Sequence, residues 1–137
     1  MKQYKNGEDT HKFILGSLDN FLQILRVLYI YYMNSQKTLD AIKSTVNSFL
    51  PGSQVLLFGS RATGNETNES DFDLLIVTSD TFAPREKMNW ENKIRKALVY
   101  SLNLPFDVIL QSKSEVNEKK NLAGHIVYYA MKAPIEL

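Results

Sequence analysis

Asp71 and Asp73 are separated by one residue and lie directly before a short apolar run, residues 74–77. Side chains alternate between the two faces of an extended strand, so these two carboxylates project from the same face. Two carboxylates on one face repel each other unless a cation lies between them. Oxygen ligands suit Mg²⁺, which usually binds one or two carboxylates together with substrate phosphates. The spacing therefore predicts a site for Mg²⁺ and a phosphate compound.

The turn that ends the preceding apolar run, residues 55–58, supplies groups that could face this metal. Gly59 and Ser60 stop that run, and a polar loop leads from them to the aspartate pair. Glycine lets backbone N–H groups approach a phosphate closely, and serine adds a hydroxyl. An aspartate pair alone is more often a solvated turn before a strand than a site. The glycine and serine placed before it favour a binding site.

These residues together resemble the signature of a known enzyme family. Gly59-Ser60-Arg61, Gly64 and the run Ser70-Asp71-Phe72-Asp73-Leu74 are similar to the signature of the DNA polymerase β-like nucleotidyltransferases. The resemblance is greatest to their small stand-alone members, the minimal nucleotidyltransferases (MNT), and it extends over residues 38–137. It implies transfer of a nucleoside monophosphate, AMP from ATP above all, to a hydroxyl acceptor. Thr63 stands where many relatives have another arginine, a departure that bears on one further phosphate contact.

A third carboxylate, Asp107, lies in the apolar run 106–110. Ile109 shares its face of the expected strand, whereas the other three residues of the run lie on the opposite face. If this strand and the strand at 72–78 are neighbours, Asp107 can meet Asp71 and Asp73 on one face. The family carries its third acidic residue at this place. The alternative for Asp107 is an ordinary residue at the end of a strand.

The resemblance implies a role for each of these residues. Two divalent ions, Mg²⁺ or alternatively Mn²⁺, stabilise both ends of an in-line displacement at phosphorus. Asp71 and Asp73 would hold the metals, while Asp107 would ligate the second metal and help to deprotonate the acceptor hydroxyl. The triphosphate tail would bind to Gly59 and Ser60. Arg61 would either contact a phosphate or form a salt bridge to the acidic cluster, and both roles remain open.

The resemblance also implies partners. Minimal nucleotidyltransferases are often paired with a small helical toxin of the HEPN type, and they can act as its antitoxin by adenylylating a tyrosine. Two alternatives remain open for this chain. It could be a binding module that neutralises a partner through contact, with weak or lost catalysis. It could also be an aminoglycoside-type enzyme that modifies a free small molecule.

A small sheet is needed to position these residues. Apolar runs predict strands at 54–58, 72–78 and 106–110 and a short edge strand at 134–137. Helices are expected at 11–32, at 35–50, after Pro84 and at 112–132, the last of these with a capping box of Ser112 and Glu115. A short helical turn is expected at 61–64. The fold class is therefore α/β (α+β), a mixed sheet of three to four strands covered by helices, like the nucleotidyltransferase palm with an extra N-terminal helix.

The first helix lies outside the resemblance. We therefore divide the chain into an N-terminal helical extension, residues 1–35, and a nucleotidyltransferase domain, residues 36–137. Asn34 and Ser35 are expected to end this helix, and Ser35 to cap the next one. The helix either folds onto its own domain or docks a second copy or another protein. It carries a heptad-like apolar stripe of Leu15, Leu18, Leu22, Leu25, Tyr29 and Tyr32.

Composition limits the partners further. The 137-residue chain has a formal net charge of +1 and no cysteine. A nearly neutral chain gives no reason to expect nucleic acid binding, and the absence of cysteine fits a reducing compartment. Asp19, Asn20, Gln23 and Arg26 interrupt the apolar first helix, so we expect no membrane span. The prediction is a cytoplasmic protein.

Overall fold

The computed structural model describes residues 6–137, with side chains from residue 9 onward. The chain divides into two compact units, an N-terminal unit (Met1–Lys37) and a C-terminal unit (Thr38–Leu137). Helix α1 (Asn6–Phe49) supplies residues to both units.

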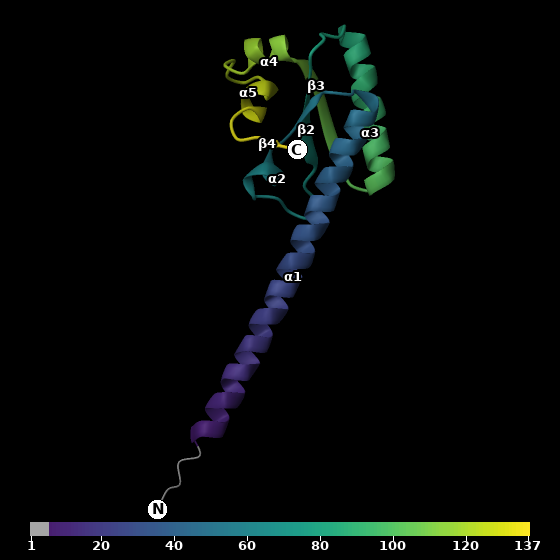
Figure 1. Ribbon diagram of the computed structural model, residues 1–137. Helices are drawn as coiled ribbons and strands as arrows, with labels where there is room; N and C mark the ends of the chain where they lie inside the picture. Colours follow the sequence, from purple (N-terminus) through teal and green to yellow (C-terminus); the bar gives the residue numbers. More distant parts are fainter. Residues whose placement is uncertain (1–5) are drawn as a thin grey trace, which may run out of the picture. The chain divides into compact units, whose positions relative to one another are not determined.

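A four-stranded mixed sheet forms the centre of the C-terminal unit (Figure 1). The strand order is β3-β2-β1-β4, with β1 at Gln54–Phe58, β2 at Phe72–Thr78, β3 at Phe106–Ser112 and β4 at Ile135–Glu136. Strand β1 is antiparallel to β2 and β4, whereas β2 and β3 are parallel. The prediction of a small mixed sheet is therefore confirmed, including the edge strand near the end of the sequence.

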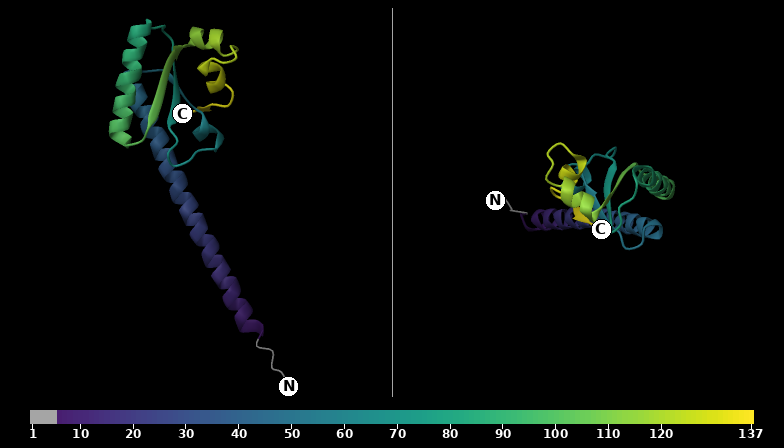
Figure 2. Two further views of the ribbon diagram at one scale, coloured as in Figure 1. Left: turned by 180° about the vertical axis from the view of Figure 1, so that it is seen from behind. Right: turned by 90° about the horizontal axis from the view of Figure 1, so that it is seen from above.

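Helices cover both faces of this sheet (Figure 2). One face packs against residues 38–49 of α1 and against α3 (Pro84–Leu102). The other face packs against α4 (Lys113–Lys119) and α5 (Ile126–Ala130). Because both faces are buried, the central strands read as nearly continuous apolar runs. The fully buried residues on the first face include Ile42, Val46, Leu74, Ile76, Ile94 and Leu98.

Local signals in the sequence account for several boundaries. Pro84 lies in the first turn of α3, where its missing N–H has no partner to lose. Ser112 and Glu115 form the expected capping box at the start of α4. The short helix α2 (Ser60–Thr63) ends at Gly64, which adopts the left-handed conformation with φ 73°. These predictions are confirmed.

The expected break in the first helix is wrong. Helix α1 continues through Asn34 and Ser35 without interruption. Inside a helix, asparagine and serine each cost roughly 0.5 kcal/mol relative to alanine. Neither residue is a glycine or proline, so the helix interior accommodates both.

The single last helix expected at 112–132 is also wrong, because two short helices replace it. Helix α4 ends at Lys119, and Gly124, with a φ of +90°, lies in the turn before α5. The His125 side chain then accepts a hydrogen bond from the Val127 N–H at 3.1 Å and caps α5. Leu122 and Ile126, two apolar residues of this stretch, are 53% and 45% exposed.

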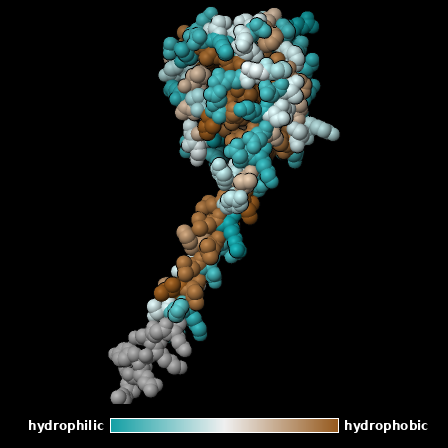
Figure 3. Space-filling view, in the orientation of Figure 1, coloured by the Kyte–Doolittle hydropathy of each residue, from teal (hydrophilic) through white to brown (hydrophobic). Residues whose placement is uncertain are grey.

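The N-terminal unit contains the first part of α1 as its one described element. Figure 3 shows apolar side chains along this part of the helix. By length and composition, the Asp9–Phe49 part of α1 includes a stretch apolar enough to cross a membrane, even with its two charged residues. The expectation that no membrane is involved therefore stays a prediction.

Candidate active site

Strand register brings Asp73 and Asp107 side by side. Asp73 pairs with Phe58 on antiparallel β1 and with Asp107 on parallel β3. The N–H of Phe72 donates to the carbonyl of Pro105 at 2.9 Å, which fixes the alignment of β2 and β3 where both strands begin. The two strands are thus neighbours, as the geometric argument for Asp107 requires.

The two aspartates lie on the sheet face that α4 and α5 cover. Alternation along each strand places Asp73 with Leu75, and Asp107 with Ile109, both of which belong to the apolar cluster on that face. Asp71 directly precedes β2 and is exposed, as is Asp107, whereas Asp73 is half-buried. The carboxylates therefore lie where the apolar cluster gives way to solvent.

The site carries uncompensated negative charge. Burial raises the pKa of Asp73 above its ordinary value, and the neighbouring charges of Asp107 and then Asp71 raise it further. Among residues 9–137, no lysine, arginine or histidine forms an ion pair with any of these three aspartates. A cation would relieve this repulsion.

The donor set fits Mg²⁺ without forming a complete cage. Within the described part of the chain, no group of three or more His, Cys, Asp or Glu side chains is close enough to hold a metal by itself. Mg²⁺ is usually bound by one or two carboxylates while water and substrate phosphates complete its shell. The pair of Asp73 and Asp107, with Asp71 nearby, is of that open kind.

Gly59 brings the turn after β1 against the Asp73 carboxylate. Its φ of +72° is a conformation that favours glycine. A Cβ added there would lie 2.2 Å from Asp73 Oδ2 and 3.1 Å from Asp73 Cγ. Only glycine therefore allows this backbone and this carboxylate to approach so closely.

Ser60 begins α2 immediately after that glycine. The N–H groups of Ala62 and Thr63 both donate to the Gly59 carbonyl, at 3.2 and 3.3 Å. No side chain caps the first turn of α2. The Thr63 hydroxyl donates back to the carbonyls of Gly59 and Ser60, both at 3.3 Å, so this side chain stays within its own turn.

Arg61 makes contacts that the sequence did not indicate. Its Nε and Nη2 donate to the carbonyl oxygen of Ser70 at 2.9 and 2.7 Å, and its guanidinium lies 4.0 Å from the centre of the Phe72 ring. Phe72 points to the face opposite Asp73. Arg61 therefore holds both residues that flank Asp71 and forms no ion pair with a described carboxylate. The two proposed roles for this residue did not include this one.

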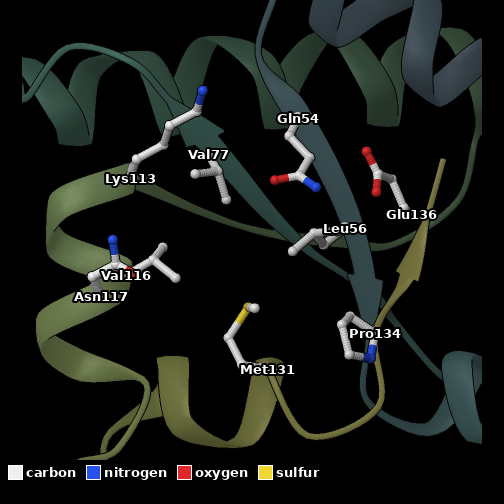
Figure 4. Close-up of a pocket in the computed structure, with 9 residues that line it drawn as sticks. All are labelled: Gln54, Leu56, Val77, Lys113, Val116, Asn117, Met131, Pro134 and Glu136. Atoms are coloured by element: carbon white, nitrogen blue, oxygen red, sulfur yellow. The ribbon is translucent and has the colours of Figure 1, made fainter.

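A separate hollow of about 410 Å³ lies farther along the same face (Figure 4). It contains none of the predicted site residues. Val77, one of its lining residues, is four positions after Asp73, or roughly 13 Å along an extended strand. The lining residues are Gln54, Leu56, Val77, Lys113, Val116, Asn117, Met131, Pro134 and Glu136.

Comparison with known proteins gives one family and several similar folds. Residues 40–130 match a family described as polymerase beta, nucleotidyltransferase, and this range contains every residue of the candidate site. No curated protein matches the sequence.

Several similar solved structures are toxin–antitoxin complexes. A chain in a mutant MntA–HpeT complex is 13% identical, with a TM-score of 0.52 over 71% of this chain and 69% of that one. A chain in a toxin–antitoxin complex with AMP-PNP is 16% identical, with a TM-score of 0.51 and the same coverage. A chain in the complex of tri-AMPylated Shewanella oneidensis HEPN toxin with MNT antitoxin is 14% identical, with a TM-score of 0.50 over 74% and 69%.

At these identities the solved structures establish a shared fold. The family match is independent of them and extends over well more than half of the chain. It includes strands β1, β2 and β3, the glycine turn and the carboxylates described above. The chain therefore belongs to the polymerase β-like nucleotidyltransferase family.

Proposed function

We propose that this protein transfers AMP from ATP to a hydroxyl group, with Mg²⁺ as its metal and Mn²⁺ as an alternative. The observation that carries the proposal is the half-buried Asp73 held between Gly59 and Asp107, with no ion pair to a cationic side chain among residues 9–137. A protein keeps such a costly charge where a bound cation or substrate uses it.

Asp71, Asp73 and Asp107 would hold the metal. When bound, a divalent ion stabilises the negative charge that develops on the phosphoryl group and on the departing pyrophosphate. The donor set described above, all oxygen and open on one side, leaves room for the phosphates to complete the shell.

The chain's own groups would bind and orient the reactants. The Gly59 backbone and the Ser60 hydroxyl would bind the triphosphate tail, beside the uncapped first turn of α2. Asp107, exposed on β3, would accept the proton of the attacking hydroxyl. Any phosphate contact by Arg61 would use Nη1 or the second N–H of Nη2, because Nε and one N–H of Nη2 already donate to Ser70.

The acceptor in this proposal is a tyrosine of a small helical toxin. Support comes from the similar folds, which occur in toxin–antitoxin complexes that include one with AMP-PNP and one with a tri-AMPylated HEPN toxin. The reaction would be carried by residues 36–137 in the cytoplasm, and the N-terminal extension would serve a separate purpose. The rival function is neutralisation of the toxin through contact, which the open carboxylate arrangement leaves possible.

The first test is calorimetric titration with ATP, with and without Mg²⁺, on the wild type and on Asp73→Asn. We expect Mg²⁺-dependent binding that the variant loses. Asp80→Asn, an exposed carboxylate beyond the end of β2, is the matched control and should bind as the wild type does. Failure of the wild type to bind any nucleoside triphosphate would reject the enzyme.

A second test separates catalysis from contact. The wild type and Asp73→Asn are mixed with a candidate HEPN toxin, and label from [α-³²P]ATP is followed onto the toxin. Transfer by the wild type alone supports the proposal. Neutralisation of the toxin by both proteins, without transfer, would favour the contact mechanism. Transfer to a free aminoglycoside would instead favour a small-molecule enzyme.

A further inference from the structure

Residues 13–33 of α1, here called the apolar segment, form a lone helix in the N-terminal unit with no other described element of that unit beside it. Its large apolar side chains are exposed, and they lie on more than half of the helix circumference. Such a surface indicates an interaction site. We propose that a second copy of this chain covers the apolar segment, packed antiparallel to it, with Asp19 of each copy paired to Arg26 of the other.

The spacing along the segment favours a helix as the partner. Its main stripe is spaced alternately by three and four residues, which is the repeat that lets side chains of one helix insert between those of another. The positions that the heptad notation calls a are Leu15, Leu22 and Tyr29. The positions called d are Leu18, Leu25 and Tyr32.

Charge decides the direction of the partner. Asp19 and Arg26 are the two charged residues of the segment, and each directly follows a d position, so they lie on one flank of the stripe. In an antiparallel pair this flank meets the same flank of the other helix. Two-fold symmetry then makes the contact reciprocal, Asp19 to Arg26 and Arg26 to Asp19. In a parallel pair this flank would meet the opposite flank instead.

The opposite flank of the stripe also favours an antiparallel pair. It consists of Ile14, Phe21 and Leu28, all apolar. An antiparallel pair places Phe21 of one copy against Leu28 of the other and adds apolar contacts to a stripe of fewer than three heptads. A parallel pair would place these apolar side chains against Asp19 and Arg26, which would then lose water without gaining a partner.

The core layers also complement each other in the antiparallel direction. Leu22 faces Leu25, Leu18 faces Tyr29, and Leu15 faces Tyr32 of the other copy. Each tyrosine therefore packs against a leucine. In the parallel direction the tyrosines would meet one another in two successive layers and the leucines in four.

The competing occupant is a lipid bilayer. The segment is long and apolar enough to span one, but a span would place Asp19 and Arg26 within hydrocarbon, where charged side chains are strongly disfavoured. Antiparallel pairing instead gives each charged group of the segment an opposite partner. The second copy is therefore the occupant that the charges favour.

Cross-linking tests this arrangement cleanly, because the chain contains no cysteine. Leu15→Cys and Tyr32→Cys are made separately in the full chain, oxidised alone and then oxidised as a mixture. We expect covalent dimers in the mixture, since these positions share a layer. Neither variant alone should cross-link, because the two copies of residue 15 would lie roughly 25 Å apart along the pair.

Charge reversal gives an independent test by sedimentation of the full chain. Asp19→Arg or Arg26→Asp should each raise the dimer dissociation constant about tenfold, and combining the two should restore it. Gln23→Arg, a matched change away from the charged flank, should have little effect. Circular dichroism and thermal unfolding of each variant show whether it remains folded.

Three results would overturn the proposal. The wild type could remain a monomer of 15.7 kDa at tens of micromolar concentration. Leu15→Cys alone could cross-link efficiently, which would indicate a parallel pair. The protein could partition into phosphatidylcholine–phosphatidylglycerol vesicles with no cross-linking of the mixed variants, which would identify the bilayer as the occupant.

Discussion

Asp73 holds a negative charge that the folded protein stabilises poorly. Its pKa is raised by burial and by the charges of Asp107 and Asp71, so the folded state binds a proton more tightly than the unfolded state does. The free energy of unfolding contributed by this group therefore falls as the pH rises through the ordinary range of an aspartate. Asp73→Asn removes this cost. We expect the variant, without metal or nucleotide, to unfold at a higher temperature than the wild type at pH 7.

The same substitution should abolish most of the activity. Charge stabilisation by a metal is worth several kcal/mol, and each 1.36 kcal/mol is a factor of ten in rate, so transfer should fall on the order of a hundredfold or more. Calorimetric scans with and without Mg²⁺ check the stability change. Addition of Mg²⁺ should raise the Tm of the wild type and leave Asp73→Asn unchanged. A lower Tm for the metal-free variant would contradict this account of the site.

Gly59 and Gly64 allow backbone conformation to be separated from contact with the carboxylate. Both have φ near +70°, but a Cβ at Gly59 would collide with Asp73 whereas a Cβ at Gly64 meets no atom within 4 Å. Each alanine substitution should cost roughly 1 kcal/mol of stability for its left-handed backbone. Only Gly59→Ala should also displace Asp73, and we expect it to weaken Mg²⁺-dependent ATP binding tenfold or more. Equal losses of ATP affinity in both variants would contradict the importance of the contact.

The spacing of residues in the sequence was sufficient to bring the site together in outline. Asp73 and Asp107 could be paired because alternation along two strands gives each residue a definite face. From the sequence, Gly59 was predicted to let a phosphate approach the backbone, but its contact with Asp73 was not predicted. The register between the strands decides which carboxylate lies beside Gly59. The contacts of Arg61 depend on how the loop of residues 65–70 folds back, and spacing does not determine that.

Helix α2 and strand β2 are linked through Arg61. Its two hydrogen bonds to Ser70 and its position over Phe72 hold the residues on both sides of Asp71. Lysine retains the charge but has neither the planar fork nor the flat face that these contacts use. We expect Arg61→Lys to weaken Mg²⁺-dependent ATP binding about tenfold, at the scale of one or two lost hydrogen bonds to a charged donor.

Arg95→Lys is the control for that substitution, because Arg95 on α3 donates to Asn92 of its own helix and lies outside the candidate site. Titration with ATP compares the two variants with the wild type. Comparison with inorganic triphosphate separates positioning from direct phosphate contact. A loss confined to ATP and triphosphate, with Mg²⁺ binding intact, would indicate that Arg61 contacts the phosphates instead of positioning Asp71.

Helix α4 is anchored by Glu115. Burial works to raise the pKa of this carboxyl, but hydrogen bonds from Lys87 and the Ser112 N–H, with the charges of Lys87 and Lys119, outweigh burial and lower it. A lowered pKa means that the stabilisation is present above the ordinary glutamate pKa and is lost as the pH falls below about 4.3. Glu115→Gln should cost about 1 kcal/mol at pH 7 and make stability less dependent on pH in acid.

Thermal unfolding at pH 3.5 to 7 measures this difference, with a Tm about 4 °C lower for the variant at neutral pH. The matched control is Glu118→Gln, an exposed position of the same helix. The Tm difference between Glu115→Gln and the wild type should shrink as the pH falls. A difference that stayed constant with pH would indicate a packing effect instead of a lost charge.

At the scale of elements, strands were easier to predict than helix ends. The apolar runs of β1 and β2 stop at turn residues, so their bounds follow from the sequence. Asn34 and Ser35 are compatible with both a cap and a helix interior, so residue type alone does not decide between them, and the structure has the interior. Helix α4 ends at Lys119, and Gly124 lies in the turn before α5 with a positive φ, which a helical pattern in the sequence does not reveal.

At the scale of the whole molecule, stability and candidate chemistry both belong to the C-terminal unit. Every residue of the two apolar clusters on the sheet lies at Leu39 or beyond, and the candidate site spans residues 59–107. Thr38, at the boundary, is a suitable cap for a helix that would begin there. Residues 38–137 should therefore fold when they are produced alone.

We expect this fragment to unfold cooperatively and to remain a monomer at concentrations where the full chain dimerises. Its affinity for ATP with Mg²⁺ should lie within about twofold of that of the full chain, a difference of less than about 0.5 kcal/mol. Calorimetry and sedimentation of both proteins measure these properties. If the fragment bound ATP but still dimerised, the self-association surface would lie on the C-terminal unit instead of the apolar segment. If it dimerised and bound no ATP, the division of roles between the two units would be wrong. A folded monomer with normal ATP affinity would mean that the N-terminal unit serves assembly and leaves the nucleotide site unaffected.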